Sequence, residues 1–301
     1  MRSSVIKVPP AWFLFIFFCA ATFLCMPAEG RAAGVESIPE RSNVLRIGFV
    51  PQDNAVRMVK KWQPLADYLS KELNRPVEIE IKPNYQGVID DLARGKVDVG
   101  LLGSFSYVRA AEGGGIVPLV RRVIFGSSYY RGIIVVRTDS AIRTLSGLKG
   151  RRFAFTDKNS TTGFVLPVRQ MKRSGLGPPE QFFSEIIYTG NHDSALLAVY
   201  SGSADGAALS TTRLDPLNAK LDHLRIIWKS ESIPLGPFVA RKSLGGATIA
   251  KLRKALLRIE SSPSTKPLLK QFGVDGFVAA RDSDYKIVRS LARSLEGLPE
   301  E

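Results

Sequence analysis

Three hydroxyl side chains stand in a row at Ser160, Thr161 and Thr162, and Gly163 follows them. They come after an apolar segment at 152–155 that predicts a strand, and before an apolar run that predicts a helix. Because the first turn of a helix leaves backbone N–H groups unpaired and carries about half a positive charge, amides and hydroxyls there can bind an oxyanion. The same residue types also cap helices, so both interpretations stay open. A nucleophilic Ser160 would need a base and an orienting partner, which the pattern does not supply.

A histidine occupies the corresponding position of the next strand–helix unit. His192 begins a predicted helix directly after a strand predicted near 185–189. The carboxyl ends of neighbouring strands in an open α/β sheet face one ligand-binding crevice, so we expect His192 to join the hydroxyl series and donate to an anion. Taken alone, it would instead be a cap or a surface residue. Pro167 complicates the preceding helix, because proline either kinks a helix or delays its regular part.

The rest of the chain offers little catalytic or metal chemistry. No HExxH, GxSxG, Walker A or GxGxxG pattern occurs. Beyond residue 33 there is no cysteine, and the two histidines, His192 and His223, lack the local spacing of metal ligands. Acidic residues are plentiful but none pair convincingly, so a secreted carboxylate hydrolase remains a rival interpretation. We expect no metal, no cofactor and no enzymatic activity.

Residues 1–33 have the pattern of a secretory signal peptide. Arg2 and Lys7 precede a charge-free stretch at 11–25, and small residues follow. A helix over that stretch would rise roughly 22 Å, short of the ~30 Å hydrocarbon core of a bilayer. Cleavage is therefore favoured, although an uncleaved segment would anchor the protein to the membrane. Both cysteines, Cys19 and Cys25, lie in this segment, so the mature protein would rely on its core rather than on disulfides.

Predicted strands and amphipathic helices alternate over the remaining chain, which is typical of an α/β fold with parallel-rich sheets. The clearest strands fall at 44–50 and 76–82, and the clearest helices at 54–73 and 85–94. After residue 150 the rhythm repeats.

A weak internal echo supports two lobes of similar build. The segments DLARGKVDVGLLG and AVYSGSADGAALS align Gly95 with Gly202 and Asp98 with Asp205. Glycine suits the C-terminus of a helix because it accepts the left-handed conformation, although two common helix-to-strand turns could also match by coincidence.

The two-lobe interpretation sets the domain boundaries. We predict lobe I from residues 34–135 plus 236–301 and lobe II from residues 136–235. The segment 132–140 would be one crossover between the lobes, and 226–241 would be the return.

The chain carries a formal net charge of +14. A basic excess can steer anions, but the basic residues occur as scattered pairs such as Lys60-Lys61 and Arg121-Arg122, which is typical of a solvated surface. They form no basic stripe interleaved with aromatic residues, so we expect no nucleic-acid partner.

An ordered series of segments carries a resemblance to a known family. The series is QPLADYLSKEL, NYQGVIDDLARGKVDVGLLGSFSYV, DKNSTTGFVLP, GNHDSALLAV and IIWKSESIPLGPFVAR. Over roughly residues 44–280 the chain resembles the phosphate/phosphite/phosphonate substrate-binding proteins of ABC transporters. The resemblance implies a two-lobed periplasmic binding protein fold of type II, with a hinge and a ligand cleft between the lobes.

The resemblance also implies particular ligand contacts. The family's phosphonate seat falls on Ser160, Thr161 and Thr162, with His192 completing it. Tyr85 corresponds to a ligand-facing tyrosine of the first lobe. The loop that carries Ser104 and Ser106 corresponds to the family's opposing helix start, although a tyrosine that some members place before its glycine is Leu102 here.

Two residues that differ from the family pattern restrict the range of possible ligands. Family members that bind 2-aminoethylphosphonate hold its ammonium with two carboxylates, and these positions are Arg213 and Gly236 here. The ligand should therefore be small, such as phosphite, methylphosphonate or phosphate, or carry a second anionic group that meets Arg213. Alternatively, Arg213 faces solvent.

The resemblance thus implies a periplasmic, monomeric protein that captures a small anionic ligand and delivers it to an ABC permease in the inner membrane. A ligand-binding subunit of a sensory system and a relative that binds an organic anion remain alternatives.

Overall fold

The computed structural model describes residues 43–214, 222–261 and 263–295, which form part of one compact unit, Ser42–Glu301. The predicted signal peptide lies outside the described residues. Within these ranges, no helix has the length and apolarity needed to span a membrane.

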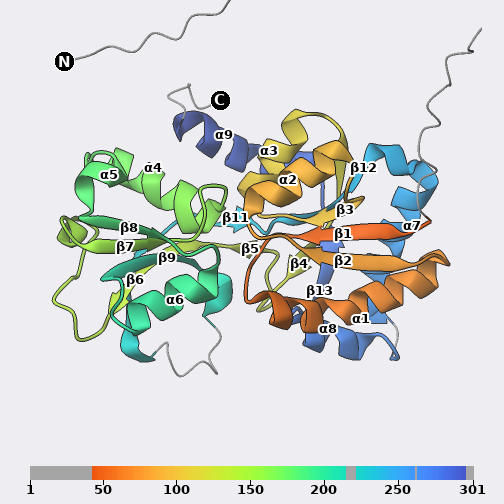
Figure 1. The fold of residues 1–301 in the computed structure, drawn as a ribbon, viewed down its shortest axis with the longest axis horizontal. Coiled ribbons are helices and arrows are strands. Elements are labelled where there is room, and N and C mark those ends of the chain that lie inside the picture. Colours follow the sequence, from red (N-terminus) through yellow and green to blue (C-terminus); the bar gives the residue numbers. More distant parts are fainter. Residues whose placement is uncertain (1–42, 215–221, 262, 296–301) are drawn as a thin grey trace, which may run out of the picture. The chain divides into compact units, whose positions relative to one another are not determined.

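The first sheet has six strands in the order β13-β4-β12-β3-β1-β2. Strands β1, β2 and β3 are parallel, whereas β12 and β13 run antiparallel to β4. The bounds of the strands are β1 Leu45–Phe49, β2 Val77–Ile81, β3 Val99–Leu101, β4 Ile116–Val123, β12 Pro237–Arg241 and β13 Gly276–Ala279. Helices cover both faces, as expected for strands that are apolar on both sides, and Figure 1 shows α2, α3 and α9 on one face with α1 and α8 on the other.

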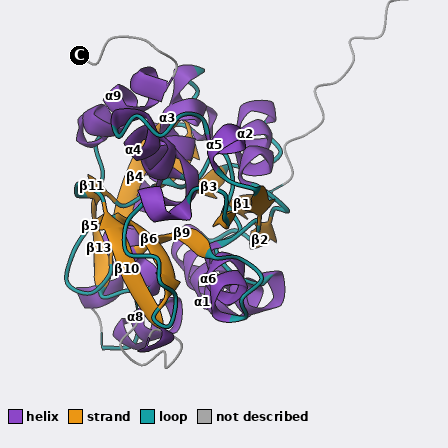
Figure 2. Ribbon diagram, turned by 90° about the vertical axis from the view of Figure 1, so that its left-hand side faces the viewer, coloured by secondary structure: helices purple, strands orange, loops and turns teal. Residues whose placement is uncertain are grey.

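The second sheet has five strands in the order β10-β6-β9-β7-β8. Strand β7 is parallel to β8 and β9, and β6 and β10 are antiparallel. The bounds are β6 Gly132–Arg137, β7 Arg152–Phe155, β8 Glu185–Tyr188, β9 Gly206–Ser210 and β10 Leu224–Lys229. Helices α4 and α5 cover one face of this sheet and α6 the other, so the strands form a middle layer between helices in the side view of Figure 2.

The helices follow the predicted periodicity closely. Their bounds are α1 Ala55–Leu73, α2 Tyr85–Arg94, α3 Ser104–Glu112, α4 Leu166–Arg173, α5 Pro179–Phe182, α6 His192–Tyr200, α7 Gly246–Arg258, α8 Lys266–Phe272 and α9 Lys286–Leu295. Helix α1 places Trp62 on the aromatic cluster of the first lobe, where its ring stacks on Phe272 at 5.4 Å. Helices α7 and α8 therefore return to the first lobe, as predicted, whereas α9 contacts α3 of the first lobe and α4 of the second.

A short antiparallel pair, β5 Tyr129–Tyr130 with β11 Ile233–Pro234, stands apart from both sheets and lies on the two crossings between them. The prediction that 132–140 is a crossover was wrong, because Gly132–Arg137 forms β6 and pairs with β9 and β10 of the second sheet. The apolar run GIIVVR reads equally as a connector or as a buried strand, and only its pairing decides. The predicted boundary at 135/136 falls inside β6, and that at 235/236 falls between β11 and β12.

The two similar sequence segments, which align Gly95 with Gly202 and Asp98 with Asp205, adopt the same local structure. Gly95 and Gly202 have φ values of 74° and 77°, a conformation that favours glycine. Asp98 then accepts a hydrogen bond from the Arg46 amide of β1 at 3.1 Å, and Asp205 accepts one from the Arg152 amide of β7 at 2.9 Å. Each lobe thus fixes the start of a central strand with the aspartate of the same motif.

Candidate functional site

A small cavity lies where the two lobes meet, and we call it the inner cavity. Its volume is about 30 Å³. The parallel strands of both sheets end at it, as is usual for ligand sites in α/β proteins. Its lining residues are Val50, Gln52, Tyr85, Leu102, Gly103, Arg122, Tyr130, Ser160, Thr161, Thr162, His192, Ser210, Thr212, Arg213, Leu235 and Gly236.

The hydroxyl series forms one wall of the inner cavity. Ser160, Thr161 and Thr162 are each at most 2 % exposed. Ser160 is the N-cap of the following helical segment, and its Oγ accepts a hydrogen bond from the Gly163 amide at 3.1 Å. A Cβ at position 163 would lie 2.1 Å from the Thr156 Oγ1 and 2.8 Å from the Ser160 Oγ, so glycine is required for this close packing. The segment from Ser160 to Thr162 therefore caps the helix and also lines the inner cavity.

The helix after Ser160 begins with a π-helical turn at Thr161–Val165, and regular α4 starts at Leu166. Pro167 occupies the first turn of α4, where a missing N–H costs least. Pro167 therefore does not kink the helix: the regular part of the helix is delayed, and the wide turn before it lies at the cavity. Such π turns are often found at functional sites.

His192 begins α6 and reaches the same cavity from the neighbouring strand β8. Its Nδ1 lies 3.3 Å from the Thr156 Oγ1, which leaves Nε2 as the nitrogen available to a ligand. Burial, with a smaller effect of the Arg213 charge, lowers the pKa of His192 to about 3. The imidazole is therefore neutral at physiological pH and contributes hydrogen bonding without net charge.

Tyr85 approaches from the first lobe, at the start of α2, and is 3 % exposed. Burial raises the pKa of its hydroxyl, although a hydrogen bond with Ser160 opposes this effect. Tyr85 thus stays protonated and can donate. The structure brings it together with Ser160, Thr161, Thr162 and His192 at one cavity.

Ser104 and Ser106 do not line the inner cavity, because their hydroxyls bind backbone carbonyls. Ser104 Oγ donates to the Pro234 carbonyl in β11 at 2.6 Å, and Ser106 Oγ donates to the Asn159 carbonyl of the second lobe at 2.9 Å. The α3 N-terminus instead meets the hydroxyl series through its backbone. Of this loop, Gly103 lines the cavity.

The two positions that depart from the aminoethylphosphonate pattern behave differently. Arg213 lines the cavity with its side chain only 20 % exposed, and its Nη1 lies 3.4 Å from Asp193 Oδ1. The alternative that it faces solvent is therefore wrong. At Gly236 a Cβ would lie 2.0 Å from the Leu102 carbonyl oxygen, so the close approach of two backbone segments leaves no room for a side chain there.

Arg122 is the main cavity residue that the sequence did not identify. It is 7 % exposed, and its Nη1 donates to Gln52 Oε1 at 3.0 Å. Burial and the charge of Arg213 lower its pKa to about 10. The sequence analysis assigned the pair Arg121-Arg122 to a solvated surface, which is wrong for Arg122. Its position within the largely apolar β4 sequence IVPLVRRV could have indicated that Arg122 is buried.

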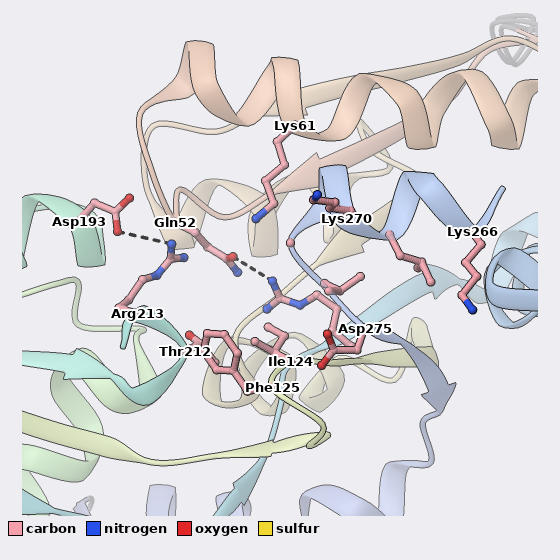
Figure 3. Close-up of a pocket in the computed structure, with 14 residues that line it drawn as sticks. Gln52, Lys61, Ile124, Phe125, Asp193, Thr212, Arg213, Lys266, Lys270 and Asp275 are labelled. Carbon is pink, nitrogen blue, oxygen red and sulfur yellow. Dashed lines mark hydrogen bonds and ion pairs between the residues drawn. The ribbon is translucent and has the colours of Figure 1, made fainter. Parts of the chain in front are cut away.

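A second, larger cavity adjoins the first, and we call it the outer cavity. Its volume is about 760 Å³, and it shares Gln52, Arg122, Thr212 and Arg213 with the inner cavity. Figure 3 shows Lys61 reaching into it from α1, while Arg213 enters beside Asp193. Burial, followed by the charges of Arg122 and Arg213, lowers the pKa of Lys61 to about 8.

Within the described ranges, no group of three or more His, Cys, Asp or Glu side chains is arranged to hold a metal ion. The inner cavity itself is lined by hydroxyls, amides, one imidazole and two guanidinium groups, with no carboxylate among its lining residues. Such a set is suited to an anion rather than to a cation.

Comparison with models of known protein families identifies the family to which most of the chain corresponds. A family model described as "ABC transporter, phosphonate, periplasmic substrate-binding protein" matches residues 47–285. The chain belongs to this phosphonate-binding family. Its members are substrate-binding components of transporters, and the resemblance predicted from the sequence is confirmed.

Individual relatives of this chain are moderately similar in sequence. The phosphonates-binding periplasmic protein of Escherichia coli K12 is 29% identical over 271 residues, covering 86% of this chain and 79% of the relative. The phosphate-import protein PhnD of Mycolicibacterium smegmatis is 29% identical over 237 residues, covering 74% and 73%. The structure of PhnD1 from Prochlorococcus marinus with methylphosphonate matches with a TM-score of 0.76 at 23% identity, covering 85% and 99%. The predicted type II periplasmic binding fold is confirmed by this likeness to solved structures of periplasmic binding proteins.

Proposed function

We propose that this protein captures a phosphorus oxyanion in the inner cavity and delivers it to the permease of an ABC importer. The observation that carries the proposal is the convergence of buried, uncharged donors from both lobes on one small cavity. Thr161, Thr162 and His192 come from the second lobe and Tyr85 from the first. A tetrahedral oxyanion would accept hydrogen bonds from all of them.

The charge around the inner cavity supports an anionic ligand. Its lining residues include Arg122 and Arg213 and no carboxylate, so the anion would be favoured by positive charge as well as by neutral donors. An ammonium group would be repelled there. This supports the prediction that 2-aminoethylphosphonate is a poor ligand.

The distribution of donors over two lobes supports a capture mechanism. A ligand that contacts both lobes stabilises their approach by the contacts it makes only in the closed arrangement. The β5–β11 pair at the crossings would then act as the hinge. A permease that recognises the closed arrangement would distinguish loaded protein from empty protein, which is the selectivity that transport requires.

The relatives support the ligand class and the location. Proteins named for binding phosphonates, importing phosphate and binding phosphite are similar in sequence to this chain over most of its length. We propose that residues 1–33 direct export and are cleaved, and that the mature protein acts as a periplasmic monomer.

Calorimetric titration tests the proposed function. Protein expressed from the full chain would be titrated with methylphosphonate, phosphite, phosphate and sulfate. We expect at least one phosphorus oxyanion to bind, and Thr161→Ala to weaken its binding about tenfold or more through loss of a hydrogen bond to a charged group. Absence of binding to every phosphorus oxyanion would disprove the proposal.

A further inference from the structure

The outer cavity has an uncompensated positive charge. Five cationic side chains and two carboxylates contribute to its lining, which leaves an excess of three positive charges. Asp193 is already beside Arg213, and Asp275 accepts a hydrogen bond from the Gly126 amide. The excess positive charge of the outer cavity therefore favours an anionic group there.

Two arginines at the junction of the cavities have buried donors without partners. Within the described ranges, the Nε atoms of Arg122 and Arg213 have no hydrogen-bond partner, and Arg122 as a whole is 93 % buried given its 7 % exposure. Arg122 pairs with Gln52, a neutral residue, and with no carboxylate of the described residues. An unsatisfied buried charged donor is costly, and an anion bound in the cleft would supply the missing partner for both arginines.

Lys61 adds a third cation from a different element. It is on α1, opposite Arg213 across the outer cavity. Burial, followed by the charges of Arg122 and Arg213, disfavours its ammonium form, and Asp53 and Asp193 oppose this shift only in part. The three cations therefore repel one another when no further anion lies among them. An anionic group among them would relieve this repulsion.

We infer that the outer cavity is a second anion subsite, where Lys61, Arg122 and Arg213 bind a carboxylate or phosphate carried by the same ligand whose phosphoryl group occupies the inner cavity. This inference rests on the proposed function. The inner cavity of about 30 Å³ accommodates one small group, whereas the adjoining 760 Å³ accommodates a substantial second part. The ligand class is therefore phosphorus compounds with two anionic ends.

Comparative calorimetry tests the inference. The full-chain protein would be titrated with methylphosphonate, phosphonoacetate and pyrophosphate. We expect phosphonoacetate or pyrophosphate to bind at least about tenfold more tightly than methylphosphonate, because a second charge-assisted set of hydrogen bonds forms. A preference for phosphonoacetate would identify the second group as a carboxylate, and a preference for pyrophosphate would identify it as a phosphate.

Variants of Lys61 and Arg213 test whether these cations cause the preference for two-anion ligands over methylphosphonate. Lys61→Gln and Arg213→Gln should each reduce the ratio of the two affinities by about fivefold or more, whereas Lys61→Arg, which keeps the charge, should retain it. Lys60→Gln and Arg173→Gln are matched controls, because both residues are exposed away from the cavity. Thermal unfolding would confirm that each variant is folded.

The possible failures are distinguishable. Equal affinity for methylphosphonate and the two-anion ligands, or a ratio unchanged in both Lys61→Gln and Arg213→Gln, would overturn the inference and leave the proposed function intact. Absence of binding to all three compounds would overturn the inference, and the proposed function would fall with it only if phosphite and phosphate also did not bind.

Discussion

The backbone amide of Phe105, on the first lobe, donates a 2.8 Å hydrogen bond to the Thr161 hydroxyl of the second lobe. Three further bonds cross the cleft nearby: Ser106 Oγ to the Asn159 carbonyl, the Tyr85 amide to Asp157, and Asn159 Nδ2 to Gln86. The hydroxyl series thus takes part in the contact between the lobes as well as in the anion capture that we propose. Ligand binding and closure should therefore be coupled at these residues.

Removing one interlobe bond should weaken all ligands by the same factor. Ser106→Ala deletes the bond to the Asn159 carbonyl, which contributes about 1 kcal/mol to the closed arrangement. We expect about a fivefold loss of affinity, with ligand preference unchanged, measured by calorimetry. The exposed Ser146→Ala is the control. A change of preference among ligands would indicate that Ser106 contacts the ligand directly.

A methyl group at position 163 should disrupt the anion seat. Gly163→Ala places Cβ 2.1 Å from Thr156 Oγ1, and Thr156 in turn contacts His192. We expect a loss of stability of about 1–3 kcal/mol in chemical denaturation, as is typical of overpacking, together with loss of phosphonate binding. Gly113→Ala is the matched control, because no atom lies within 4 Å of its Cβ position and its φ is −73°. Equal stability of the two variants would contradict the packing argument.

Replacing Arg122 by a neutral residue should stabilise the ligand-free protein while reducing its affinity. Arg122→Met removes a buried charge that has no anionic partner within the described ranges, and the exchange should raise the free energy of unfolding by about 1–3 kcal/mol. Arg152→Met should instead lower it, because Arg152 binds Asp205 and the Gly202 carbonyl. Denaturant titration of both variants checks the prediction. A destabilised Arg122→Met would indicate that Arg122 supports the fold.

Because His192 is buried, the stability of the folded protein should decrease in acid. Its pKa is about 3 in the folded protein and 6.5 ordinarily, so the unfolded chain binds a proton below about pH 6.5 that the folded protein excludes. The free energy of unfolding should therefore fall as pH decreases from about 6.5 to 3, by up to about 1.4 kcal/mol per pH unit. In His192→Gln this contribution should be absent, whereas in the exposed His223→Gln it should remain. Identical pH profiles for wild type and His192→Gln would contradict the assignment.

Lys61 predicts proton uptake on binding of a two-anion ligand. Its pKa of about 8 reflects burial and the charges of Arg122 and Arg213, opposed by Asp53 and Asp193. An anion beside the ammonium raises that pKa, so binding near pH 8.5 should take up a proton and weaken as pH rises further. Calorimetry of phosphonoacetate in buffers of different ionisation enthalpy measures this uptake.

The same measurement on Lys61→Met is the control. Protons taken up by the ligand itself contribute equally in both proteins, so the difference in uptake reports on Lys61. The uptake should be smaller in the variant than in the wild type. Equal uptake in both proteins would show that Lys61 does not meet the ligand.

Local patterns were sufficient for much of the fold and for the second-lobe seat. Hydrophobic periodicity predicted α1, α2 and the principal strands, and the hydroxyl series with Gly163 predicted a helix start at a crevice. His192 followed from the same rule applied to the next strand. These features depend on residues close together in sequence, so sequence alone determined them.

Other features depended on contacts between distant residues. Arg122 reads as a surface residue until Gln52, 70 positions away in the chain, is packed against it. Ser104 and Ser106 read as cavity residues until the carbonyls of Pro234 and Asn159 take up their hydroxyls. The run at 132–137 became a strand of the second lobe only through its partners β9 and β10.

The sequence by itself thus determined the α/β alternation, the family and the helix start that lines the inner cavity. The tertiary structure alone decided which charges are buried, where the chain crosses between lobes and how large the ligand space is. The physical reason is that turns and caps are fixed by neighbouring residues, whereas desolvation and cavity volume arise from segments that meet only after folding.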